Sequence, residues 1–203
     1  MTLSAKGTKL NRRGLETREQ LLRLAIRCLA EGGPDAVSAN LVAREAGVTW
    51  GTIQHQFGDA DGLWAAMLEY IGTKWETVLP EVPENATLAA RVDAVVEMLW
   101  NALERPASKA VTNLRTALPH RPRDLEAAYP RTASALATWD AEWSATCDRA
   151  FDGVLVDRTR LARIRGLLPA ALRGLRDEQN LSTFTDVDES RRGLSEAITA
   201  YLS

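Results

Sequence analysis

Apolar residues recur every three or four positions along almost the whole chain of 203 residues, and this helical spacing constrains the fold more than any other feature. No segment alternates apolar and polar residues over the length of a useful strand, and no internal repeat or low-complexity segment interrupts the pattern. The apolar content of 45% is typical of a globular protein with a buried core. The sequence therefore predicts an all-α protein of about nine helices.

Short polar residues and glycines mark the expected helix ends. The first helix is predicted to begin at Thr17, with Gln20 three residues later as its capping partner, and to end at the Gly32-Gly33-Pro34 stop. A left-handed turn at Gly47 is predicted to end the second helix. The proline-rich stretch LPHRPRD is predicted to be a turn with His120 as a loop residue. Side-chain caps of the next three helices are predicted at Ser38, Thr49 and Asp61.

Residues 38–57 predict a helix-turn-helix. Two short helices are joined by Ala46-Gly47-Val48, and the small side chain of Ala43 lets them cross closely. Val48 and Ile53 are expected to fill the angle between the helices. The second helix is then left with its other face exposed, as it is in proteins that insert such a helix into the major groove of DNA.

The exposed face of this second helix has side chains suited to contacts with DNA. Thr49 can donate its hydroxyl to a phosphate, and the Trp50 ring and Thr52 can pack on thymine methyl groups. Gln54 or His55 can reach base edges or the backbone, and a glycine lets the helix backbone come close. The predicted DNA-binding residues of this segment are Ser38, Thr49, Trp50, Gly51, Thr52, Gln54 and His55.

The charge distribution adds a second candidate contact with DNA. The net charge of −2 argues against a nucleic-acid partner, but the first 27 residues hold seven lysines and arginines and only two glutamates. Residues 1–16 are therefore predicted to be a basic arm, with Arg12 and Arg13 as DNA-binding residues. By charge alone, the same residues would also suit a solvated tail.

Residues 17–71 resemble the DNA-binding domain of the TetR family of transcriptional repressors. The stretch TREQLLRLAIRCLAEGGPDAVSANLVAREAGVTWGTIQHQF has the family's order of a first helix, a Ser-capped second helix, AGV, a recognition helix with GT, and a closing phenylalanine. The resemblance implies a three-helix DNA-binding head, for which we expect residues 17–60. It also implies a helical body over 61–203 that binds an effector and forms a homodimer through its last two helices.

The sequence departs from the family pattern at two positions. Gln54 lies where such proteins often have a tyrosine for a phosphate contact, and Ala60 lies where a lysine often opens the fourth helix. Asp59 and Asp61 beside it reduce the attraction for phosphate on that side of the head. Arg12 and Arg13 are expected to compensate by reaching the neighbouring minor groove.

The body is predicted to contain the effector site and the dimer interface. A cavity lined by tryptophans would suit an apolar or aromatic effector, although a fully packed core would use the same residues. The predicted ligand-binding residues are Trp75, Val96, Leu99, Trp100, Trp139 and Trp143. Small residues at 166, 170, 171 and 174 would allow close approach of a second copy. The predicted dimer-interface residues are Ile164, Leu168, Leu172, Leu194 and Ile198.

Other functional classes lack a sequence signature. The chain has no GxSxG, P-loop, GxGxxG or HExxH motif, and it has only two histidines, so no catalytic site, metal or cofactor is predicted. It also lacks a transmembrane-length apolar stretch and the apolar core of a signal peptide, which favours a cytoplasmic protein. We expect a homodimeric repressor that binds palindromic operator DNA and responds to a small-molecule effector. A helical adaptor protein and an enzyme with no recognisable motif are the alternatives.

Overall fold

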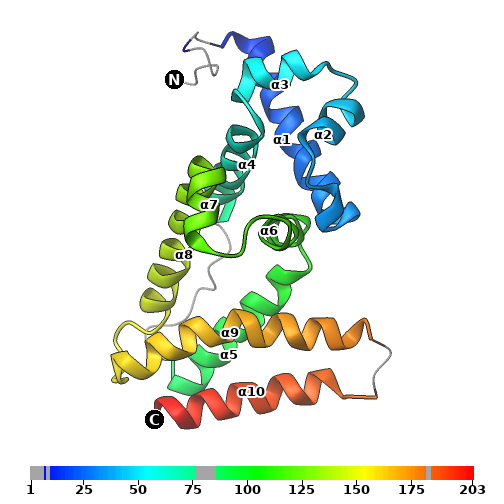
Figure 1. Cartoon of the computed structure of the whole chain (residues 1–203). Helices are drawn as coiled ribbons and strands as arrows, with labels where there is room; N and C mark the ends of the chain where they lie inside the picture. The colour runs from blue at the N-terminus through cyan, green and yellow to red at the C-terminus, as the bar shows by residue number, and fades with distance from the viewer. Residues whose placement is uncertain (1–6, 8–9, 76–85, 182–183) are drawn as a thin grey trace. The chain divides into compact units, whose positions relative to one another are not determined.

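The computed structural model describes residue 7 and residues 10–75, 86–181 and 184–203, with the side chain of Trp75 excepted. Within these ranges the chain forms ten α-helices and one 3₁₀ helix and no strand, which confirms the all-α prediction (Figure 1). The elements are α1 (Arg12–Gly32), η1 (Pro34–Ala36), α2 (Ala39–Glu45), α3 (Trp50–Phe57), α4 (Ala60–Trp75), α5 (Leu88–Leu103), α6 (Pro106–Ala117), α7 (Pro122–Ala128), α8 (Pro130–Ala150), α9 (Arg158–Gln179) and α10 (Val187–Leu202).

Helix α7 was not predicted, and it begins within the stretch LPHRPRD that was predicted to be a turn. Pro122 occupies the first position of α7, where the missing N–H of proline has no partner to lose and its fixed φ suits a helix. Asp124 lies in the first turn, where the helix dipole favours a negative charge. His120 lies exposed in the segment between α6 and α7, as predicted. The prolines thus end one helix and begin another.

Helix α1 begins five residues before the predicted start. The Asn11 side chain caps it by accepting a hydrogen bond from the Gly14 N–H at 2.9 Å. Thr17 is not the cap, because its hydroxyl donates to the Arg13 carbonyl one turn earlier at 2.9 Å. Residues 12–16 of the predicted basic arm are therefore helical.

The chain divides into two compact units, one formed by residues 1–76 and 105–140 and the other by 77–104 and 141–203. The predicted boundary between residues 60 and 61 falls inside the first unit, because α4 packs against α1 and α3. The predicted head is therefore part of a larger packed unit.

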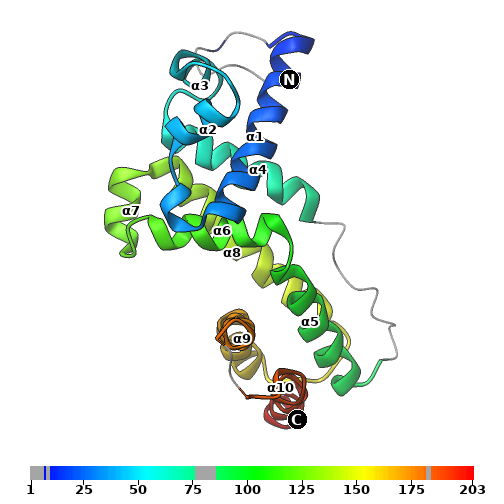
Figure 2. The ribbon, with the colours of Figure 1, turned by 90° about the vertical axis from the view of Figure 1, so that its right-hand side faces the viewer.

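The core of the first unit lies among α1, α2, α3, α4 and α6, with α1 packed against α2, α4 and α6 (Figure 2). Leu29, Ile53 and Leu114 are completely shielded from solvent in this core. The Asn113 side-chain amide donates to the Leu29 carbonyl at 2.7 Å and so ties α6 to the C-terminal end of α1. The helix-turn-helix is thus built on the same core as α6.

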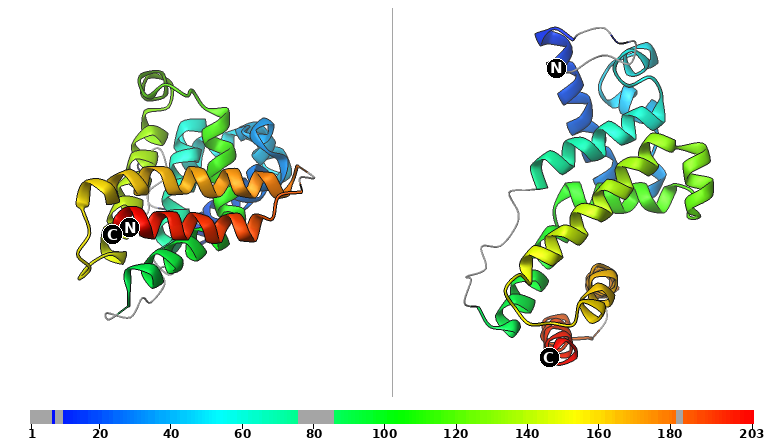
Figure 3. Two further views of the ribbon diagram at one scale, coloured as in Figure 1. Left: turned by 90° about the horizontal axis from the view of Figure 1, so that it is seen from below. Right: turned by 90° about the vertical axis from the view of Figure 1, so that its left-hand side faces the viewer.

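The second unit is formed by α5, α9 and α10, together with the C-terminal part of α8. Helices α9 and α10 run antiparallel beside each other, and both pack against α5 (Figure 3). The Arg91 guanidinium of α5 donates to the Ala150 carbonyl at 2.9 Å, which satisfies a carbonyl at the C-terminal end of α8.

The residues predicted for the dimer interface belong largely to this internal core. Ile164, Leu168, Leu172 and Ile198 are 8%, 3%, 0% and 3% exposed in a single chain, and Leu194 is half-buried against them. Four of the five predicted side chains are therefore already covered by their own α5, α9 and α10, and the assignment of Leu194 stays a prediction. Any contact between copies through α9 and α10 has to use another face of these helices.

Candidate nucleic-acid interface

Helices α2 and α3 form the predicted helix-turn-helix, and local hydrogen bonds set the turn. Ser38 caps α2 as predicted, with its hydroxyl accepting from the Leu41 N–H at 3.3 Å. The turn itself has Gly47 at a φ of 64°, a left-handed conformation that glycine adopts without steric cost. The Val48 N–H then donates to the Ala43 carbonyl at 3.0 Å and directs the chain into α3.

Helix α3 has one buried face and one exposed face. Ile53 and Phe57 are 0% and 3% exposed and hold the buried face in the core. Thr49 is at the N-cap position as predicted, but its side chain makes no capping bond and its hydroxyl lies 3.4 Å from that of Thr52. The exposed residues are Thr49, Trp50, Gly51, Gln54 and His55, and Ser38 and Thr52 are half-buried. None of the seven residues predicted here is buried.

A pair of polar residues that sequence reasoning missed fixes α3 to the start of α1. Arg18 donates to the Gln56 carbonyl at 2.5 Å, and its guanidinium lies 4.4 Å from the centre of the Phe57 ring. The buried Gln56 side chain in turn donates to the Gly14 carbonyl at 3.2 Å. The sequence feature that could have indicated this contact is Gln56, a polar residue at a helical position between two buried apolar residues.

Asp61 was predicted to cap α4, but it does not. Asp59 does so, accepting from the Gly62 N–H at 2.9 Å, and Asp61 instead accepts from the N–H groups of Arg131 and Thr132 at 3.1 and 2.8 Å. Asp61 therefore caps the N-terminal end of α8. Burial of its carboxylate raises its pKa, but these hydrogen bonds outweigh burial, so the pKa of Asp61 lies below its ordinary value.

Arg131 connects this cap to α3. Its guanidinium forms ion pairs with Asp59 and Asp61 and donates to the Phe57 carbonyl, the last residue of α3, at 3.3 Å. Gly62 makes room for this contact, because a Cβ there would lie 2.0 Å from that carbonyl oxygen. The two aspartates that were expected to reduce the attraction for phosphate thus have their charge offset by an arginine.

Arg12 and Arg13 are exposed in the first turn of α1. The Arg12 Nε lies 2.9 Å from a carboxylate oxygen of Glu16, one turn along the helix. An exposed pair of this kind contributes little stability and leaves the guanidinium accessible to solvent. The helix, rather than an arm, therefore positions these two charges.

The six residues predicted to bind a ligand are divided between the two units. Trp139 is half-buried against the core of the first unit, whereas Trp143 packs on the core of the second and donates its indole N–H to the Arg165 carbonyl at 3.1 Å. Val96, Leu99 and Trp100 are buried core residues. The guanidinium of Arg176 lies 3.6 Å from the centre of the Trp100 ring. The side chain of Trp75 lies outside the described residues.

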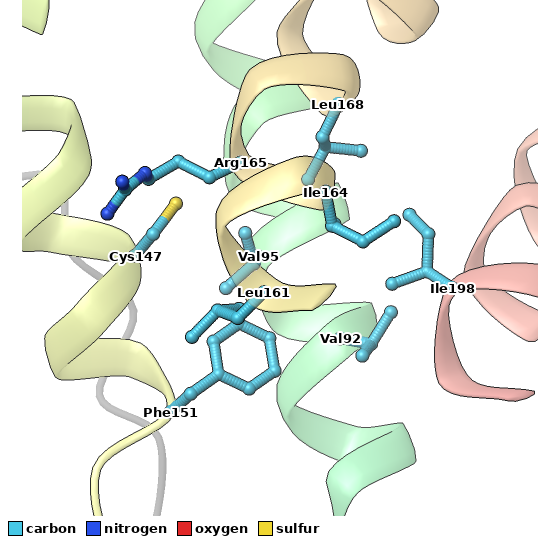
Figure 4. A pocket seen from close by; sticks show the side chains of 9 residues that line it. All are labelled: Val92, Val95, Cys147, Phe151, Leu161, Ile164, Arg165, Leu168 and Ile198. Atoms are coloured by element: carbon cyan, nitrogen blue, oxygen red, sulfur yellow. The ribbon is translucent and has the colours of Figure 1, made fainter. Parts of the chain in front are cut away.

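A small apolar pocket lies within the second unit (Figure 4). It has a volume of about 10 Å³, enough for roughly one water molecule. Figure 4 shows Cys147 and Arg165 beside each other at one side of the pocket. Burial raises the pKa of the Cys147 thiol to about 12, so the thiol is protonated at neutral pH. The lining residues are Val92, Val95, Cys147, Phe151, Leu161, Ile164, Arg165, Leu168 and Ile198, none of which was predicted to bind a ligand.

Neither a metal site nor a membrane span is found among the described residues. No three histidine, cysteine or acidic side chains there are grouped so that they could hold a metal ion. None of the described helices combines the length and apolar character that crossing a bilayer requires. The cysteines Cys28 and Cys147 are both free, the first half-buried and the second buried.

Residues 21–67 match the sequence model of the family described as "Bacterial regulatory proteins, tetR family". The match extends from within α1 through α2 and α3 into α4 and so includes the whole helix-turn-helix. A search of curated proteins found no significant match.

Several solved structures share the fold over nearly the whole chain. A transcriptional regulator from Rhodococcus sp. Rha1 is 20% identical, with a TM-score of 0.65 over 91% of this chain and 93% of that one. A TetR family protein from Vibrio parahaemolyticus is 20% identical, with a TM-score of 0.64 over 92% of this chain and 98% of that one. The multidrug binding protein EbrR, solved in complex with imidazole, is 23% identical, with a TM-score of 0.64 over 99% of this chain and 98% of that one. At these identities the likeness shows the fold.

Proposed function

The chain belongs to the TetR family of bacterial regulatory proteins, and from this premise we propose that it represses transcription by binding palindromic operator DNA as a homodimer. Two copies would place their α3 helices in successive major grooves, about 34 Å apart. A small, mainly apolar effector would release the DNA. Because its target is chromosomal DNA, the proposed repressor acts in the bacterial cytoplasm.

The exposed face of α3 is the observation that carries this proposal. Ile53 and Phe57 fix the helix to the core, and Thr49, Trp50, Gln54 and His55 are left exposed on the other side. The helix has no acidic residue that would repel phosphates. Arg12 and Arg13 in the first turn of α1 add positive charge to the same unit, where hydrogen bonds of Arg18 and Gln56 join α1 to α3.

The outer faces of α9 and α10 support the proposed homodimer. These faces expose small residues, and a Cβ added at Gly166 or Gly174 would meet nothing within 4 Å beyond its chain neighbours and the adjacent backbone of α9. Leu167 lies among them and is 55% exposed. Small residues allow two helix pairs to approach closely, and an apolar side chain exposed to this degree gains from being covered by a second copy. The small exposed residues of the two helices are Ala162, Gly166, Ala170, Gly174, Gly193, Ala197 and Ala200.

The apolar pocket supports the proposed effector site. The pocket has room for about one water molecule, so the surrounding helices must separate before a larger ligand can bind. Such a ligand should quench the fluorescence of Trp143, which is hydrogen-bonded to the carbonyl of the pocket residue Arg165. It should also raise the melting temperature and release DNA at the same concentration. Ligands that raise the melting temperature without affecting DNA release would contradict the proposed coupling.

The repressor proposal is tested by binding to the DNA upstream of the chain's own gene. A bandshift should show a complex with this duplex that a scrambled duplex of the same composition does not displace. Its affinity should fall as salt rises, because binding releases the counterions of the phosphates. Equal affinity for the two duplexes, or no complex at low salt, would contradict sequence-specific DNA binding.

A further inference from the structure

The side chains on the exposed face of α3 also indicate which base pairs the helix reads. Trp50 and Gln54 are four residues apart, so they lie one turn apart on the same side of the helix. Both are exposed, and Trp50 is at the first helical position. These two side chains therefore reach neighbouring positions of any surface that the face meets.

The composition of α3 excludes the commonest contact with guanine. That contact is a bidentate pair between arginine or lysine and the O6 and N7 atoms of the base, and WGTIQHQF contains neither residue. The helix also lacks the acidic residue that would accept from the amino group of cytosine. The Gln54 amide has one donor and one acceptor group that match the N7 acceptor and N6 donor of adenine.

Trp50 adds an apolar surface beside Gln54. Its side chain is 37% exposed, and thymine is the base that presents a methyl group in the major groove. Gly51 follows directly, and a Cβ at this position would lie 3.5 Å from the Thr49 hydroxyl, an ordinary contact distance. The fold thus has room for a side chain at residue 51, and its absence lets the backbone approach the groove.

We propose that α3 reads adjacent A·T pairs in each half-site, with the Gln54 amide on an adenine and the Trp50 ring against the methyl group of a neighbouring thymine. The inference rests on the proposed function, since it requires α3 in the major groove. It adds the base composition that the helix selects.

Selection of duplexes from a random library by the full-length protein tests this inference first. The enriched half-sites should share a core of adjacent A·T pairs. Enriched cores of G·C pairs would overturn the base assignment and leave sequence-specific DNA binding intact. Failure to enrich any sequence would contradict the proposed function and the inference with it.

Single-atom changes in the selected duplex then test each contact. Deoxyuridine in place of the core thymine removes one methyl group and should weaken binding about fourfold. Replacing the core adenine with 7-deazaadenine removes the N7 acceptor and should weaken binding at least about fivefold. The first loss should vanish in Trp50→Ala and the second in Gln54→Ala.

His55→Ala is the matched control for these two variants, because it alters the same exposed face. Its affinity should still fall with deoxyuridine and with 7-deazaadenine, as that of the wild type does. Circular dichroism should first show that all three variants are folded. If either loss persists after its own residue is replaced, the assignment of that base contact is wrong.

Discussion

Asp59 and Asp61 lie two residues apart at the start of α4 and serve the N-terminal ends of two different helices. Asp59 accepts from the Gly62 N–H within α4, whereas Asp61 accepts from two N–H groups of α8, 70 positions further along the chain. Arg131 forms ion pairs with both carboxylates, offsets one of their two negative charges and reaches the last carbonyl of α3. Three helix ends are therefore stabilised by three charged side chains within the first unit.

Replacing Asp61 with asparagine should destabilise the first unit by about 1–3 kcal/mol, because one of the two N–H groups at the start of α8 loses its acceptor. The pKa of Asp61 is lowered in the folded state, so its stabilisation is complete above the unfolded pKa of about 3.9 and is lost as the pH falls through the folded value. Urea unfolding between pH 3 and 7 should show a smaller loss at acid pH in Asp61→Asn than in the wild type.

The exposed Asp93 of α5 provides the matched control for this measurement, since Asp93→Asn should retain the wild-type loss of stability at acid pH. An Asp61→Asn variant as stable as the wild type at pH 7 would show that the cap on α8 contributes nothing.

At the scale of helices, the sequence predicted the elements that apolar periodicity and glycine define. Gly47 and Ile53 were assigned correctly because a left-handed turn and an apolar residue on a helix face leave local signals. The start of α1 was missed because Asn11 precedes two arginines and the apolar stripe begins only at Leu21. The cap of α8 was missed because its acceptor comes from a distant part of the chain, which no local pattern records.

The helical position of Arg12 and Arg13 makes their contribution to DNA binding measurable. If both contact phosphates, replacing both with alanine should reduce the slope of log K against log salt by up to about two, since each phosphate neutralised contributes about 0.9. Fluorescence anisotropy at four or five salt concentrations determines this slope. A slope equal to that of the wild type would show that neither side chain contacts phosphate.

On the scale of the whole molecule, the residues predicted for the dimer interface lie on faces of α9 and α10 that are largely buried within one chain. Leucines repeated at helical spacing indicate that a face is covered, but they do not tell whether the cover is the same chain or a second copy. The structure shows that α5 covers Leu168 and Leu172, whereas the small residues on the outer face are exposed. Helical spacing likewise did not tell that Trp139 and Trp143 pack on different cores.

Leu167→Arg should convert the proposed dimer to a folded monomer, because Leu167 is 55% exposed and the charge would be buried only between copies. Leu168→Arg, one residue further, should instead unfold the second unit, because Leu168 is 3% exposed. Sedimentation equilibrium at micromolar concentration distinguishes a folded monomer from unfolded protein. The wild type should remain a dimer at this concentration, because a stable obligate interface usually exceeds about 2,000 Å². A wild-type protein that sediments as a monomer would contradict the homodimer.

The central claim is that the exposed face of α3 makes the contact with DNA, and the affinity of Thr52→Asp for the selected duplex tests it most directly. A carboxylate at this third position of α3 is favoured by the helix dipole, so folding should be retained, whereas its charge would face the phosphates. Thr112→Asp, with the same charge change on the exposed surface of α6, is the control. Anisotropy titrations should show no specific binding by Thr52→Asp and wild-type affinity for Thr112→Asp. Wild-type affinity in a folded Thr52→Asp protein would contradict the claim.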